Sequence, residues 1–79
     1  MSKIHIISRG NNKWALKREG SSRAIKLFVT RESAIRNSKD WLYNTDTLVI
    51  HNKDGTVAKI IKNAGRLTED RLIKTAGYL

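Results

Sequence analysis

The chain offers few side chains suited to chemistry, and its two histidines, His5 and His51, come first because it contains no cysteine. Their separation along the sequence matches no pair of metal ligands on one helix or one hairpin, so no metal site is predicted. His51 shortly precedes Asp54, an arrangement that could serve acid–base chemistry. A histidine at a strand end before an Asp-Gly turn more often makes a turn or cross-strand contact. We therefore expect structural or surface roles for both histidines.

Nucleophiles and phosphate-binding loops are the next candidates. Ser21 and Ser22 precede Arg23 in a predicted turn, without the glycine elbow between strand and helix that exposes a hydrolase nucleophile. No glycine-rich loop followed by Lys and Ser or Thr is present to hold a nucleotide phosphate. The sequence therefore predicts no enzyme, no catalytic residue and no cofactor.

Basic side chains form the strongest candidate site. The 79 residues contain 16 Lys and Arg against 7 Asp and Glu, a formal net charge of +9 that favours association with polyanions. Several of these cations fall on two neighbouring predicted strands, within reach of a phosphate backbone. The residues expected to contact nucleic acid or another acidic partner are Lys13, Lys17, Arg18, Arg23 and Lys26.

Recognition of bases by stacking would require exposed aromatic side chains. Trp14 and Trp41 follow the apolar pattern and are expected to pack in the core, which leaves Phe28, Tyr43 and Tyr78. We therefore expect contact with phosphates rather than readout of bases.

A helix over residues 30–43 is expected to be the element against which the sheet forms. Thr30 is a predicted N-cap, and Glu32 in the first turn suits the positive end of the helix dipole. Apolar or small residues at spacings of three and four then predict one buried face. This face consists of Ala34, Ile35, Ser38, Trp41 and Leu42.

Stretches with β-branched residues or strict alternation predict five strands, three before the helix and two after it. The first three read as an antiparallel meander, and the last two as a hairpin around the Asp54-Gly55 turn. The predicted strands cover residues 2–9, 13–18, 23–29, 47–51 and 56–62.

Alternation also assigns the two faces of this sheet. One face should pack under the helix through Ile4, Ile6, Trp14 and Leu16. The opposite face is either solvated and basic, through Lys13, Lys17 and Lys26, or covered by the C-terminal segment or a second subunit. The register of the last strand stays open, because Val57, Lys59 and Ile61 alternate with Ala58 and Ile60 and either set could face the core.

The C-terminal segment is expected to form a short helix that starts at Thr68 and runs to about Ala76. Leu72 and Ile73 belong to its apolar side, so it should dock on its own sheet, giving a monomer, or on a second copy, giving a homodimer. The predicted fold is thus a single small α+β domain of order βββαββ, with a mostly antiparallel sheet packed on one helix plus a short C-terminal helix. Residues 1–63 form the domain and residues 64–79 the helical appendage.

Three stretches of this sequence resemble the small prokaryotic domain-of-unknown-function family 2188. The pattern of that family runs W-x-V, a turn with Gly, Ala before an aromatic residue, a T-K-x-x-A-I helix start and a hydrophobic-His-x-x-D-G hairpin. Arg31 stands here in place of the usual Lys, and Leu16 in place of the usual Val. The matching stretches are Trp14-Ala15-Leu16-Lys17-Arg18-Glu19-Gly20, Phe28-Val29-Thr30-Arg31-Glu32-Ser33-Ala34-Ile35 and Val49-Ile50-His51-Asn52-Lys53-Asp54-Gly55-Thr56-Val57. The resemblance implies the fold and no activity, since the family has none assigned.

Two functions are compatible with these observations. The first is a non-catalytic module that binds nucleic-acid phosphates with little sequence preference. The second is a small protein-binding or inhibitory accessory, for example one encoded by a phage or mobile element, that docks on an acidic surface of a larger host complex. The sequence has no secretory h-region and no apolar run long enough to span a membrane, so a cytoplasmic location is expected for either.

Overall fold

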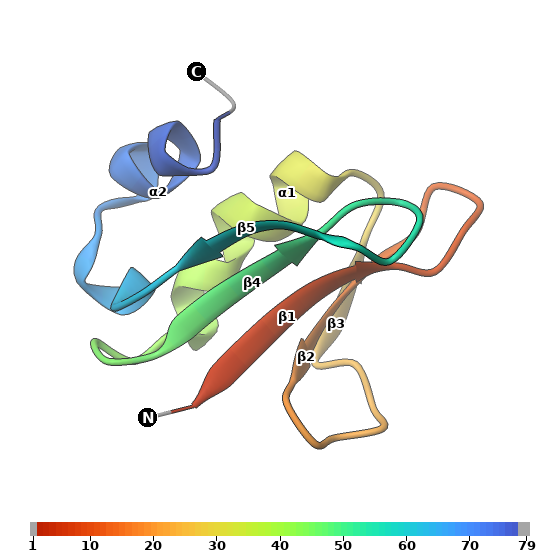
Figure 1. The fold of residues 1–79 in the computed structure, drawn as a ribbon, viewed down its shortest axis with the longest axis horizontal. Coiled ribbons are helices and arrows are strands. Elements are labelled where there is room, and N and C mark those ends of the chain that lie inside the picture. Colours follow the sequence, from red (N-terminus) through yellow and green to blue (C-terminus); the bar gives the residue numbers. More distant parts are fainter. Residues whose placement is uncertain (1, 78–79) are drawn as a thin grey trace.

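The computed structural model describes residues 2–77, and within them the helices and strands follow the predicted order (Figure 1). The α+β class, the order βββαββ and the short C-terminal helix are confirmed. The elements are β1 (Lys3–Ser8), β2 (Trp14–Arg18), β3 (Lys26–Phe28), α1 (Arg31–Asn37), the 3-10 helix η1 (Ser38–Trp41), β4 (Thr47–His51), β5 (Val57–Ile61), the 3-10 helix η2 (Ala64–Arg66) and α2 (Glu69–Thr75).

The strands form one mixed sheet in the order β3-β2-β1-β4-β5. The pairs β1–β2, β2–β3 and β4–β5 are antiparallel, as predicted for the meander and the hairpin, whereas β1 and β4 are parallel. A parallel pair needs a crossover connection, and α1 with η1 provides it between β3 and β4. The sheet is therefore mostly antiparallel, with one parallel pair at its centre.

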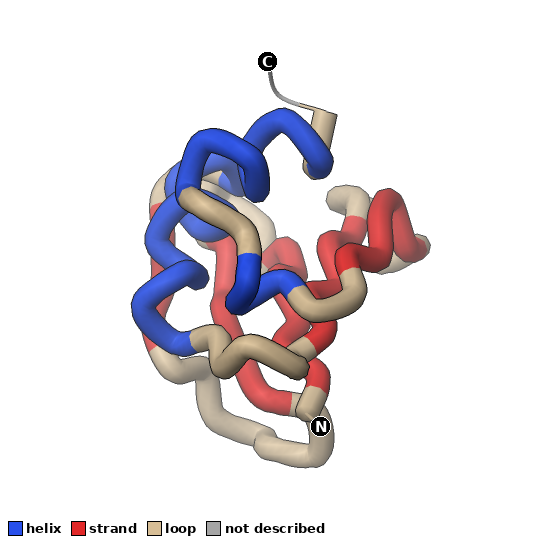
Figure 2. Tube along the Cα trace, turned by 90° about the vertical axis from the view of Figure 1, so that its left-hand side faces the viewer, coloured by secondary structure: helices blue, strands red, loops and turns tan. Residues whose placement is uncertain are grey.

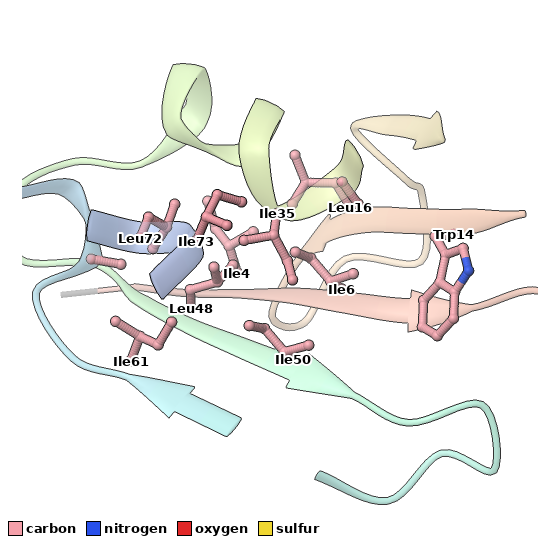
Figure 3. Packing of buried hydrophobic residues seen from close by; sticks show 12 residues of the cluster. Ile4, Ile6, Trp14, Leu16, Ile35, Leu48, Ile50, Ile61, Leu72 and Ile73 are labelled. Carbon is pink, nitrogen blue, oxygen red and sulfur yellow. The ribbon is translucent and has the colours of Figure 1, made fainter. Parts of the chain in front are cut away.

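Both α-helices lie on one side of this sheet (Figure 2). Ile4, Ile6 and Leu16 point from the central strands toward Ile35 of α1, and all four are fully buried (Figure 3). The predicted packing of this face under the helix is confirmed. The rest of the cluster comes from the same sheet face, from both α-helices and from η2, through Trp14, Ala34, Leu48, Ile50, Ile61, Ala64, Leu72 and Ile73.

α1 begins where predicted and ends earlier. The Thr30 hydroxyl accepts a hydrogen bond from the Ser33 N–H at 3.0 Å. At buried Ser38, whose hydroxyl donates to the Ile35 carbonyl at 2.6 Å, the chain tightens into η1. A 3-10 helix has about 3.0 residues per turn instead of about 3.6, so Trp41 rotates off the apolar stripe and is 41% exposed. The prediction of a buried Trp41 is wrong, whereas Trp14 is in the core.

A β-bulge settles the register of the last strand. Ile61 pairs with Leu48 on the helix side, and Ile60 pairs with Val49 on the other face. Between Ile50 and His51 the pairing shifts by one residue, which places Val57 opposite His51. Val57 therefore leaves the face occupied by Ile61, although simple alternation would put both on the same side.

The C-terminal segment folds back onto the same side of the sheet as α1. The Thr68 hydroxyl caps α2 by accepting from the Arg71 N–H at 3.3 Å, as predicted. Leu72 and Ile73 are buried in the common core, so within the described residues α2 does not cover the opposite face. No helix within residues 2–77 is long and apolar enough to cross a membrane.

Candidate functional site on the open face of the sheet

We call the sheet face away from α1 and α2 the open face. It lies opposite the buried residues of each strand and combines three kinds of side chain: histidines, lysines and aliphatic residues. None of the five strands contains an acidic residue. The open face consists of Lys3, His5, Ile7, Lys13, Ala15, Lys17, Leu27, Thr47, Val49, His51, Val57 and Ile60.

The five predicted binding cations do not all share this face. Lys13 and Lys17 lie on it, at positions that alternate with Trp14 and Leu16 of the core. Lys26 pairs with buried Leu16 and so lies on the helix side, which makes its predicted place on the basic face wrong. A residue directly opposite a core residue points the same way, and the sequence did not reveal that the short strand β3 pairs in this register.

Arg18 and Arg23 lie elsewhere on the β2–β3 hairpin. Arg18 pairs with buried Ile4, donates to the Trp41 carbonyl at 3.4 Å and has its guanidinium carbon 5.9 Å from the ring centroid of Tyr43. Arg23 is exposed in the loop between β2 and β3. Of the predicted cations, the structure therefore brings only Lys13 and Lys17 together on one face.

The exposed aromatic residues do not form a stacking surface on the open face. Phe28 pairs with Trp14 on the helix side, where the Lys26 ammonium lies 5.7 Å from its ring centroid. Tyr43 is 70% exposed but belongs to the loop after η1, and Tyr78 lies outside the described residues. The described Phe, Tyr and Trp side chains thus offer no row of rings beside the lysines of the open face.

A chain of hydrogen-bond contacts crosses the centre of the open face. His5 Nδ1 lies 3.0 Å from His51 Nε2, because the parallel pairing of β1 and β4 brings the two rings together. The outer nitrogens have partners as well: His5 Nε2 lies 3.2 Å from Glu19 Oε1, and His51 Nδ1 lies 3.1 Å from the Gly55 carbonyl oxygen. Sequence reasoning missed this cluster, since its two histidines are 46 positions apart and meet only through a long-range pairing.

A shallow hollow of about 550 Å³ lies at the end of the sheet where the β1–β2 and β4–β5 turns meet the start of α1. Arg31 organises it: its guanidinium donates to the His51 carbonyl at 3.3 Å and to Asn52 Oδ1 at 3.2 Å, and lies 5.5 Å from the Trp14 ring centroid. Arg31 therefore contacts both Trp14 and Asn52, which come from two other stretches of the family pattern. These contacts hold the β4–β5 hairpin to the helix start, which gives the motif a structural role.

Within residues 2–77 no group of three or more His, Cys, Asp or Glu side chains is placed to hold a metal ion. The two histidines and Glu19 form a linear chain of contacts rather than a shell around one point. The arrangement is a row of hydrogen-bonding groups with the lysine of β2, Lys17, beside it.

Comparison with known proteins adds one finding. No curated protein and no solved structure matches this chain. A family model described as "Uncharacterized protein conserved in bacteria (DUF2188)" matches residues 4–62, from β1 to just beyond β5, and leaves η2 and α2 outside. Because the match spans most of the sequence and includes all five strands and α1, the chain belongs to this family of bacterial proteins, DUF2188.

Proposed function

We propose that the protein is a non-catalytic binding module that contacts nucleic-acid phosphates through the lysines of the open face. The observation that carries this proposal is the shortage of internal partners for its positive charge. Within residues 2–77, Arg36 pairs with Glu32 at 3.1 Å and with Glu69 at 3.4 Å, whereas none of the lysines on the open face forms a salt bridge. The excess of +9 is therefore carried largely by side chains that remain available to an external anion.

The open face concentrates three such lysines, Lys3, Lys13 and Lys17, on strands without acidic residues. Lys13 and Lys17 are four residues apart along one strand, roughly 13 Å, so they reach different phosphates rather than clamping one. Among the described residues no Phe, Tyr or Trp ring lies beside them on this face, so the face provides charge rather than a row of large stacking rings. This combination supports binding with little sequence preference.

Salt-dependent binding of labelled DNA and RNA tests the proposal. Release of counterions by three lysines predicts an affinity that falls roughly forty-fold between about 50 and about 200 mM monovalent salt. The triple variant Lys3→Glu, Lys13→Glu, Lys17→Glu should abolish binding at the lower salt concentration. The matched control, Arg66→Glu, Arg71→Glu, Lys74→Glu, makes the same change in net charge at exposed positions of η2 and α2, outside the open face, and should retain most of the affinity.

Two results would overturn the proposal. The first is an absence of binding at low salt for the unmodified chain. The second is an equal loss of affinity in the two triple variants, which would assign any attraction to net charge alone.

A second candidate function follows from three exposed aliphatic residues on the same face. Leu27, Val57 and Ile60 are 51%, 51% and 54% exposed, and an apolar centre with a charged rim is the usual anatomy of a protein–protein interface. We propose as the alternative an accessory or inhibitory module, such as a phage-encoded one, that docks on an acidic surface of a host complex. For either role we propose a cytoplasmic location.

Affinity capture after nuclease treatment separates the two candidates. A stoichiometric protein partner that is retained by the unmodified chain and lost from Leu27→Asp, Ile60→Asp favours docking on a protein. Loss of all partners with the nuclease favours direct binding of nucleic acid. A homodimer formed through the same aliphatic residues would appear in sedimentation of the purified chain as a doubled mass that the same pair of substitutions removes.

A further inference from the structure

The hydrogen-bond chain Glu19–His5–His51–Gly55 fixes how many protons its two histidines hold. A carboxylate and a backbone carbonyl only accept hydrogen bonds, so the contacts of His5 Nε2 with Glu19 and of His51 Nδ1 with the Gly55 carbonyl both require an N–H on the imidazole. The inner contact, 3.0 Å between His5 Nδ1 and His51 Nε2, requires a third N–H between the rings. Two neutral imidazoles carry only two N–H groups in total.

We infer that the His5–His51 pair is a proton-binding site that holds one extra proton at neutral pH, shared across the inner contact, so that the pair carries a single positive charge. With two neutral rings, either the inner nitrogens would face each other as lone pairs or an outer contact would join two acceptors. One extra proton removes both conflicts. The inference concerns the free protein and holds whether or not the open face binds phosphate.

The charged groups around the pair act in opposite directions. Glu19, in the loop after β2, contacts the outer nitrogen of His5 and favours the extra proton. Lys17 of β2 pairs across the sheet from His5, lines the same hollow of about 180 Å³ and opposes the proton by repulsion. Two further cations oppose it as well: Lys3 of β1, which lines a second hollow together with Glu19, and Arg31 of α1, which donates to the His51 carbonyl at 3.3 Å. The open-face neighbours from β4 and β5, Val49 and Val57, carry no charge. The site therefore depends on Glu19 as the acceptor at its end.

Replacing this acceptor with a group that can also donate tests the inference. The carboxamide introduced by Glu19→Gln can donate an N–H to His5 Nε2, and all three contacts are then satisfied by two neutral rings. The substitution removes one negative charge, and the pair releases its one positive charge. The expected net charge of the Glu19→Gln protein at pH 7, measured by native capillary electrophoresis, therefore equals that of the unmodified protein.

The matched control is Glu69→Gln, which removes an exposed, salt-bridged carboxylate on the helix side of the molecule. This variant should gain one unit of positive charge. Imidazole ¹⁵N spectra at pH 7 provide a second measurement: the unmodified protein and Glu69→Gln should show three protonated nitrogens in the pair, and Glu19→Gln two. Two neutral rings in the unmodified protein would overturn the inference, and so would a gain of one charge in Glu19→Gln when the rings of that variant are both neutral.

Discussion

Asp46 is a buried acidic residue whose side chain is used to join parts of the chain, and it is only 2% exposed. Its carboxylate accepts hydrogen bonds from the Tyr43 N–H at 2.9 Å and from the Ser2 N–H and hydroxyl at 3.3 and 3.2 Å. Burial raises the pKa of this carboxyl, but those hydrogen bonds and the nearby Arg18 charge outweigh burial, so its pKa lies below the ordinary 3.8. The N-terminal residues are thereby held to the start of β4.

This lowered pKa predicts how stability depends on pH. Since the folded-state pKa is below the unfolded one, Asp46 contributes stability that is fully present above about pH 4 to 5 and is lost as the pH falls through the folded-state pKa. Asp46→Asn should therefore lower the free energy of unfolding by about 1–3 kcal/mol at pH 7, and by clearly less at pH 2.5. Urea denaturation at the two pH values measures this, with exposed Asp70→Asn as the control. A difference between Asp46→Asn and the unmodified protein that is the same at both pH values would contradict it.

Arg31 is the second residue whose contacts predict a measurable effect. Its guanidinium reaches the His51 carbonyl, the Asn52 side chain and the Trp14 ring at once, which a lysine ammonium cannot do with the same planar geometry. Arg31→Ala should lower the free energy of unfolding by about 1–2 kcal/mol, and Arg31→Lys by less. Thermal unfolding measures the order. The exposed control Arg71→Ala should change the free energy of unfolding by less than about 0.5 kcal/mol. An Arg31→Lys protein as unstable as Arg31→Ala would contradict the predicted order, because it would show that the charge and the aliphatic stem of residue 31 contribute nothing to stability.

For single residues, a contact can be predicted from the sequence when its two partners are close together in the chain. The caps at Thr30 and Thr68 are predicted and confirmed because an N-cap side chain bonds a backbone N–H three residues ahead. The pairing of His5 with His51 could not be predicted in the same way, since neither residue has a local signal for the other. It depends on β1 lying parallel to β4, which is a property of the whole sheet.

Elements show the same division between local and long-range causes. The helix start and the Asp54-Gly55 turn follow from residues within a few positions, and both are found. The early end of α1 and the bulge in β5 depend on how Ser38 and Val57 fit against neighbouring elements. The register in which the short strand β3 pairs with β2 likewise places Lys26 on the helix side, so the residues of the binding face could be predicted only in part.

Gly65 in η2 lies so close to the backbone of the loop after η1 that a side chain at this position cannot be accommodated. A Cβ atom at this position would lie 2.0 Å from the Tyr43 carbonyl oxygen and 2.8 Å from the Asn44 nitrogen, both backbone atoms. The Lys39 ammonium also donates to the Gly65 carbonyl and holds η2 against η1. Gly65→Ala should therefore lower the free energy of unfolding by about 3 kcal/mol or more, because the backbone must separate there.

Gly20→Ala is the control for this substitution. Gly20 has φ +82 and nothing within 4 Å of its Cβ position, so alanine there incurs only the strain of a left-handed backbone, about 1–2 kcal/mol. Chemical denaturation of the two variants compares them. If Gly20→Ala lowered the free energy of unfolding as much as Gly65→Ala does, the backbone around Gly65 and Tyr43 would be able to separate at little cost.

For the whole molecule, the placement of α2 decides which surface is left for partners. Both helices pack on one face, so the sheet is covered on one side and carries its histidines, lysines and exposed aliphatic residues on the other (Figure 2). The sequence predicted that the C-terminal helix docks and left its face undecided. Its apolar residues fit either side of a sheet, and the structure places them on the α1 side, where Leu72 and Ile73 join the buried cluster that contains Ile61.

Removal of residues 64–79 tests how much of the fold depends on this docking. The family match ends at residue 62, yet Ala64, Leu72 and Ile73 lie in the same buried cluster as the β-strands. Burial of a Leu or Ile side chain contributes about 1.5–3 kcal/mol, so the truncated chain loses roughly 3–6 kcal/mol. A typical domain has only about 5–15 kcal/mol in total. We therefore expect a chain ending at Asn63 to unfold at a much lower temperature, or without a cooperative transition.

Single substitutions in the full chain show whether that loss comes from docking rather than from shortening. Ile73→Ala should lower the free energy of unfolding by about 2–4 kcal/mol, while its exposed neighbour Lys74→Ala, on the same helix, should change it by less than about 0.5 kcal/mol. Differential scanning calorimetry of the three proteins beside the unmodified chain measures the series. If the truncated chain melts as the full chain does, the strands and α1 are sufficient by themselves. The burial of Leu72 and Ile73 would then stabilise only α2, and the part of the chain matched by the family would be an independent folding unit.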